Sequence, residues 1–170
     1  TVHSSRRRFA ARLNSGVRSQ ENPLFTFGRE HERKCAVAYV RNPAQAELIL
    51  QVVDAVHDFL EGKAPKEPLS QTIRTAFVDG GSGVWEQAGS WLRKLCSECP
   101  QLGELWIEFA QSQNLNVRFR VACSLDDIPN SIISRVTSIL LADKSKKVAA
   151  MARERSSSQL LQGPNESPAA

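Results

Sequence analysis

The chain has 170 residues, of which 41% are hydrophobic and 24% charged, and its formal net charge is +4. This length and balance are typical of a globular protein with its own core, and they exclude a disordered or fibrous chain. No apolar run approaches the roughly 20 residues of a membrane span, and Arg6–Arg8 lack the following apolar stretch of a secretory signal. Four cysteines in a chain this long do not form a disulfide scaffold, so we expect a cytoplasmic protein with reduced thiols and no membrane partner.

The net charge is unevenly distributed. Residues 1–34 carry eight Lys and Arg against three acids, a net of +5, and residues 144–170 carry five against two, a net of +3. Residues 35–143 carry nine against thirteen, a net of −4. A nucleic-acid reader concentrates positive charge on its folded surface, so an acidic middle with basic ends disfavours that class.

Residues 1–28 predict a flexible basic arm and residues 162–170 a disordered tail, with one helical domain expected over 29–161. Apolar periodicity predicts helices over 29–41, 43–61, 69–78, 84–99, a segment after Pro100, 116–126, 130–141 and from about 145. The first segment could also pass as a strand over Ala36–Val40, and we expect about seven helices in all. Asn42 and Pro43 predict a capped helix start, and Gly62 predicts its end.

A degenerate repeat occupies the second half of the chain. Val84, Val117 and Val148 are separated by steps of 33 and 31 residues, and each is followed four positions later by a small or β-branched apolar residue. Asp79 and Asp143 stand five residues before the first and third valines. A period of this length predicts stacked helical hairpins, because one hairpin cannot bury its apolar stripe alone.

The repeat resembles the HEAT repeats of the armadillo-like helical family. Residues 140–148, which read Leu-Leu-Ala-Asp-Lys-Ser-Lys-Lys-Val, are similar to the family's inter-repeat turn, and Val117-Arg118 matches its Val-Arg pair. The resemblance covers about residues 77–155 and departs from the family at Trp85, Ser112 and Ala149. It implies an all-α, short right-handed solenoid of antiparallel helical hairpins that recognises other macromolecules, and it implies no catalytic set.

Three small clusters could carry chemistry. Cys96 and Cys99 form half of a zinc site, but no paired ligands accompany them, so we expect no metal and no cofactor. The helix after Pro43 carries one cluster that could act as an acid–base pair or simply form a solvated face: Asp54, His57, Asp58 and Glu61. Glu104 and Glu108 resemble paired hydrolase carboxylates, and they too could be merely solvated. No nucleophile elbow, phosphate loop or dinucleotide fingerprint occurs, so we expect no enzyme.

The polar stripes favour partner binding. Carboxylates recur along one face of the helix after Pro43 and of the helix after Pro100, and in HEAT-like stacks the second helix of each hairpin lines the concave surface. We therefore expect a non-catalytic module that holds a basic protein partner on an acidic concave face, with an immunity protein that neutralises a basic toxin as the sharper hypothesis. The residues expected to contact the partner are Asp54, Asp58, Glu61, Glu104 and Glu108.

The rival hypothesis is nucleic-acid binding, because one branch of HEAT-like proteins consists of DNA alkylation-repair glycosylases. That hypothesis requires one shared surface for a set of cations: Arg93, Lys94, Arg118, Arg120, Lys146 and Lys147. Arg118 has an alternative role as the structural partner of an acid in a neighbouring turn. A third possibility is that the chain is part of a larger assembly.

Overall fold

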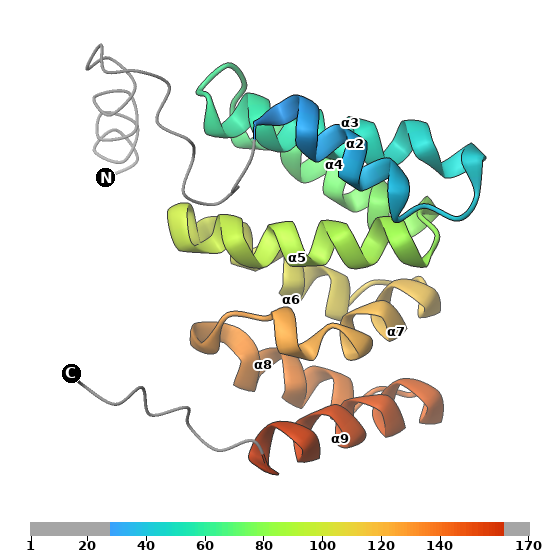
Figure 1. The fold of residues 1–170 in the computed structure, drawn as a ribbon. Helices are drawn as coiled ribbons and strands as arrows, with labels where there is room; N and C mark the ends of the chain where they lie inside the picture. The colour runs from blue at the N-terminus through green and yellow to red at the C-terminus, as the bar shows by residue number, and fades with distance from the viewer. Residues whose placement is uncertain (1–27, 162–170) are drawn as a thin grey trace, which may run out of the picture. The chain divides into compact units, whose positions relative to one another are not determined.

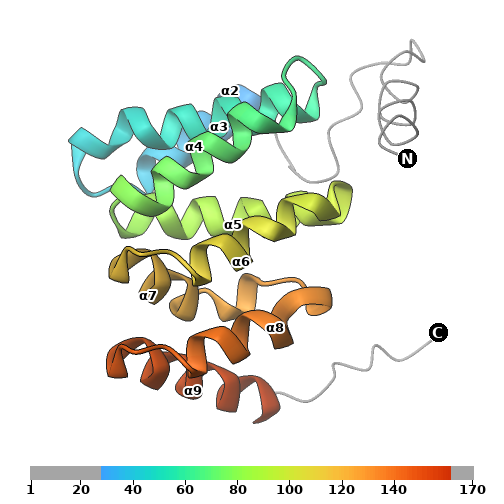
Figure 2. The same cartoon turned by 180° about the vertical axis from the view of Figure 1, so that it is seen from behind.

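The computed structural model describes residues 28–161, and their side chains as far as residue 157. These residues form eight α-helices and three short 3-10 helices and contain no strand, which confirms the all-α class (Figures 1 and 2). The predicted basic arm, apart from Gly28, and the predicted tail lie outside the described residues. The chain divides after Lys94 into two compact units, which are described separately.

The first unit contains α2 (Arg29–Ala38), η1 (Pro43–Gln45), α3 (Ala46–Leu60), α4 (Lys66–Asp79) and α5 (Ser82–Glu98) as far as Lys94. Helix α3 contacts both α2 and α4, and residues 36–40, which could have passed as a strand, continue and close helix α2 (Figure 1). The core is built mainly from α3, α4 and α5. Its largest buried side chains are Ile49, Val52, Val53, Leu69, Ile73, Phe77 and Leu92.

Local signals explain where these helices begin and end. The Asn42 side chain accepts a hydrogen bond of 3.0 Å from the Ala44 amide, and Gly62 has a φ of 71° just after α3, as predicted. Helix α4 begins at Lys66, three residues earlier than predicted, with Pro68 inside its first turn. Proline is tolerated there because the amides of the first turn have no intrahelical acceptor.

Two close contacts join the segment after α2 to the start of α5. The Gly81 amide donates a hydrogen bond of 2.6 Å to the Gln45 side chain. A Cβ atom on Gly83 would lie 2.5 Å from the Tyr39 carbonyl oxygen, so only glycine permits this approach. The Asp79–Gly83 segment, expected only to break the helix, therefore also anchors the chain that follows α2.

The second unit contains η2 (Pro100–Gly103), α6 (Glu104–Ala110), α7 (Leu115–Cys123), η3 (Leu125–Asp127), α8 (Asn130–Leu141) and α9 (Lys146–Leu161). Helix α6 contacts α7 and α8, and α9 contacts α7 and α8, so the helices pack mainly with their sequence neighbours and next neighbours (Figure 2). The stripe predicted after Pro100 is buried as expected: Leu102, Leu105, Trp106 and Phe109.

The repeat positions have equivalent environments. Val84, Val117 and Val148 are all buried, and each begins the apolar face of its helix, on α5, α7 and α9. The small residues four positions later are buried as well: Ala88, Val121 and Ala152. The sequence repeat thus marks core positions. Among the described residues, no helix is both long enough and apolar enough to cross a membrane.

Candidate partner-binding site

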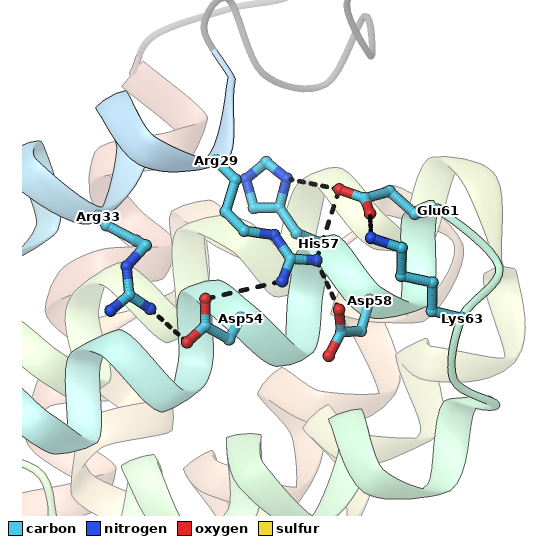
Figure 3. A network of polar contacts seen from close by, with 7 residues as sticks. All are labelled: Arg29, Arg33, Asp54, His57, Asp58, Glu61 and Lys63. Atoms are coloured by element: carbon cyan, nitrogen blue, oxygen red, sulfur yellow. Dashed lines mark hydrogen bonds and ion pairs between the residues drawn. The ribbon is translucent and has the colours of Figure 1, made fainter. Parts of the chain in front are cut away.

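The carboxylates expected on the helix after Pro43 lie in a row along α3 and face cations from α2 (Figure 3). Arg29 donates to Asp58 over 2.5 Å and lies 3.4 Å from Glu61 and 3.9 Å from Asp54. Arg33 donates to Asp54. Arg29 contacts Asp58 and Arg33 contacts Asp54, so α2 and α3 run antiparallel. The two arginines are four residues apart on α2, and the two aspartates are four residues apart on α3.

Electrostatics favours the charged form of each partner in this row. The hydrogen bond to Asp58 raises the pKa of Arg29, and the hydrogen bond to Asp54 raises that of Arg33. Lys63 forms an ion pair with Glu61 and lowers the pKa of its carboxyl group. Three carboxylates are therefore compensated by three cations of the same unit, so this row does not present the open acidic surface that the sequence predicted.

His57 does not belong to the solvated face on which the sequence analysis placed it. Its side chain is buried beneath the row, and its Nδ1 atom lies 3.8 Å from a Glu61 carboxylate oxygen. Burial lowers the pKa of His57, because the charged imidazolium would lose its hydration. Position 57 follows the buried Val53 by four residues and Val56 by one, which places it at the edge of the core face.

The expected acidic body also changes once the helices are known. Arg29, Arg33 and Lys34, counted above with the basic N-terminal residues 1–34, belong to α2 and hence to the first unit. Residues 28–94 then carry nine cations and nine acids, a net charge of 0, and residues 95–161 carry eight and seven, a net of +1. Neither unit as a whole therefore carries the net negative charge that the sequence predicted for the folded body.

Glu104 and Glu108 lie on α6, in the second unit, where both are exposed. Gln101 and Gln111 are exposed at the two ends of the same segment, and Arg135 is exposed on the neighbouring α8. The structure thus keeps these two glutamates together at i and i+4, as predicted. The carboxylates of α3 belong to the other unit.

The cations of the nucleic-acid hypothesis do not share one environment. Arg118 is buried, where its Nε atom donates to Asp143 over 2.6 Å and its Nη1 atom donates to the Ser112 carbonyl over 2.8 Å. The alternative prediction, that Arg118 pairs with an acid in a neighbouring turn, is confirmed. Lys146 and Lys147 are exposed on α9, and the Lys147 ammonium lies 4.2 Å from the ring centroid of Phe119.

Cys96 and Cys99 offer little metal chemistry in this arrangement. Cys96 is buried, and burial, with a smaller contribution from Cys99, raises the pKa of its thiol to about 12. The Cys99 thiol donates to the Gln101 side chain over 3.2 Å. In the described part of the chain, no three His, Cys, Asp or Glu side chains converge as metal ligands would.

The first unit also contains a cleft of about 510 Å³ that was not predicted from the sequence. It lies where the segment after α2 meets the start of α5, and its lining is mostly polar. The lining residues are Tyr39–Asn42, Gln45, Gly81–Val84, Glu86 and Gln87. The glycine-rich Asp79–Gly83 segment was the only available signal, and it indicated a helix break without indicating what would lie against it.

Comparisons with protein-family models, with curated proteins and with solved structures found no match to this chain.

Proposed function

We propose that this chain is a non-catalytic, HEAT-like helical module that binds a basic helix of a protein partner on the carboxylates of α3. The observation that carries the proposal is that Asp54 and Asp58 already hold two arginines spaced by four residues on another helix. Any helix with cations at i and i+4 offers the same geometry, because such side chains lie one above the other on a single face.

Contacts within the second unit support the HEAT-like architecture. Helix α6 contacts α8 and α7 contacts α9, as expected when successive hairpins stack with equivalent helices adjacent. The Arg118–Asp143 pair joins the arginine of one repeat block to the aspartate that precedes the next. These contacts recur with the period of the sequence repeat, and they explain why the repeated residues occur at that spacing.

The distribution of charge over the helices supports a protein partner over nucleic acid. The cations that the rival hypothesis requires are on α5, α7 and α9, the first helices of the hairpins, and one of them, Arg118, is buried. Glu104 and Glu108 are on α6, a second helix, which lines the concave side in HEAT-like stacks. We propose that these two glutamates form an additional contact for a basic segment.

The binding test uses a labelled peptide with the sequence of residues 28–41 and the full chain carrying Arg29→Gln and Arg33→Gln, which frees the α3 carboxylates from their internal cations. Adding Asp54→Asn and Asp58→Asn to this chain should weaken peptide binding about twofold to thirtyfold, the combined range for two exposed ion pairs. Glu47→Gln on the same exposed side of α3 is the matched control, because Glu47 pairs with Gln51 and not with an arginine.

Fluorescence anisotropy at low salt measures the affinity, with a peptide whose arginines are replaced by glutamine and a DNA duplex as competitors. Binding that ignores the two aspartates would overturn the proposed site. Tight binding of the duplex together with no binding of the peptide would instead favour the nucleic-acid hypothesis. The variants Glu104→Gln and Glu108→Gln test the additional contact in the same assay.

A further inference from the structure

Helix α2 contributes few buried residues to the first unit. Ala36 is its only buried residue, whereas α3 buries six residues and α4 buries five. Its other apolar side chains near the C-terminal end are largely outside the core, with Val37 39% and Tyr39 61% exposed. A ten-residue helix is too short to be stable alone in water, so its docking must hold it.

Ion pairs join α2 to α3. Arg29 and Arg33 reach across to Asp58 and Asp54, and all four side chains are between 30% and 39% exposed. Ion pairs at this exposure are weak and are screened by salt. Helix α2 is therefore attached by contacts that solvent ions can replace.

The two ends of α2 are anchored differently. Beyond its C-terminal end, the Tyr39 carbonyl lies against Gly83, and Gln45 accepts a hydrogen bond from the Gly81 amide, so the chain there is fixed to α5. At its N-terminal end, the contacts of Arg29 with α3 are the ionic ones. Opening would pivot α2 about residues 39–42, which line the 510 Å³ cleft.

We propose that α2 is a displaceable strap that covers the binding row of α3, closed by the Arg29–Asp58 and Arg33–Asp54 pairs, and that a basic partner helix replaces it. This inference rests on the proposed function, and it adds that the chain inhibits its own site. The geometry of the strap also specifies the partner helix that would replace it. That helix carries two cations four residues apart and binds in the antiparallel register that α2 now occupies.

Hydrogen exchange measured by mass spectrometry tests the strap without any partner. Exchange of the α2 amides should rise when the salt concentration goes from about 0.1 M to about 1 M, because the screening length falls from about 10 Å to about 3 Å. The double variant Arg29→Gln, Arg33→Gln should raise α2 exchange about twofold to thirtyfold at low salt. Lys34→Gln is the matched control, since Lys34 is an exposed cation of the same helix.

Protection of the α4 amides reports whether each variant remains folded, because α4 is held by its own buried apolar face. Unchanged α2 exchange in the double variant and at high salt would overturn the strap. The quadruple variant Arg29→Asp, Arg33→Asp, Asp54→Arg, Asp58→Arg, which reverses both pairs, should return α2 hydrogen exchange to within about threefold of the original value. If α2 exchange stays high in this quadruple variant while the α4 amides remain protected, the strap would also be overturned.

The peptide of residues 28–41 separates the two proposals. It should bind the Arg29→Gln, Arg33→Gln chain about twofold to thirtyfold more tightly than the original chain, because no internal arginines compete. Equal affinity for both chains would overturn the strap and leave the proposed function standing. An α2 that opens with salt, together with no peptide binding to either chain, would overturn the proposed function and the replacement of α2 by a partner, and would support only the salt-sensitive docking of α2.

Discussion

The buried pair of Arg118 and Asp143 allows a sharp test of how the second unit is held together. Their side chains are 8% and 4% exposed, and Asp143 also accepts a hydrogen bond of 2.7 Å from the Ser145 amide, at the start of α9. Burial alone would raise the pKa of Asp143, but the hydrogen bonds from Arg118 and Ser145 and the nearby positive charge outweigh it, and the net shift is downward. The pair therefore links α7 to the turn before α9 in its ionised form.

Replacing Arg118 by methionine keeps much of the side-chain volume but removes every hydrogen bond of the guanidinium. The Asp143 carboxylate then stays buried with the Ser145 amide as its remaining hydrogen-bond donor, and the Ser112 carbonyl loses a donor. Breaking a buried ion pair on one side costs about 3–5 kcal/mol. Because the Ser145 amide remains, we expect about 3 kcal/mol, measured as the fall in the free energy of unfolding in urea.

Two further variants test whether the uncompensated charge of Asp143 causes this loss of stability. Asp143→Asn in the Arg118→Met background removes the uncompensated charge and keeps an acceptor for Ser145, so it should recover about 1 kcal/mol or more. Arg155→Met is the matched control, since Arg155 pairs with Asp126 over 3.5 Å at 43% exposure and should cost less than about 1 kcal/mol. A loss below about 1 kcal/mol for Arg118→Met, or no recovery in the double variant, would refute the reasoning.

Two other predictions concern the first unit. Because burial lowers the pKa of His57 below its ordinary value of 6.5, the unfolded chain takes up a proton before the folded one as the pH falls. The contribution of neutral His57 to stability should thus be complete above about pH 7 and decline toward about pH 5. Unfolding in urea across this range should show that the free energy of unfolding depends less on pH in His57→Leu than in the original chain. An equally steep dependence on pH in both chains would contradict the assignment. Gly83→Ala should lower the melting temperature by about 2–12 °C, equivalent to about 1–3 kcal/mol, because the new Cβ would lie 2.5 Å from the Tyr39 carbonyl oxygen. Gly81→Ala, whose Cβ would meet only the Gln45 side chain at 3.7 Å, should change it by less than about 2 °C, and similar losses for both variants would show that the backbone contact is not the cause.

Much of the fold was readable from the sequence because its signals are local. The apolar spacing inside each valine block, the Asn42 cap and the Gly62 stop each act within one or two helical turns, and all three lie where they were expected. The early start of α4 was missed, because a proline in the first turn looks the same in sequence as one that precedes the helix.

The candidate site was less readable, since it depends on which helices meet. The four-residue spacing of Arg29 and Arg33 and that of Asp54 and Asp58 are both present in the sequence, but their pairing needs the direction and register of α2 on α3. Without that register, the α3 row was interpreted as open and the arginines as belonging to the basic end of the chain. Pairing between helices is a tertiary property that charge counts along the chain do not contain.

Exposure gives the two arginine–aspartate contacts of this protein opposite consequences. At Arg118 and Asp143, water is excluded and neither partner can leave without stranding a charge, so the contact fixes one arrangement of α7 and α9. At Arg29 and Asp58, each ion keeps part of its hydration, so separation costs little and another cation can take the place of the arginine. The same type of ion pair therefore fixes the arrangement of two helices where it is buried, and it is an exchangeable contact where it is exposed to solvent. Only the second kind is suited to recognising a partner that must bind and leave.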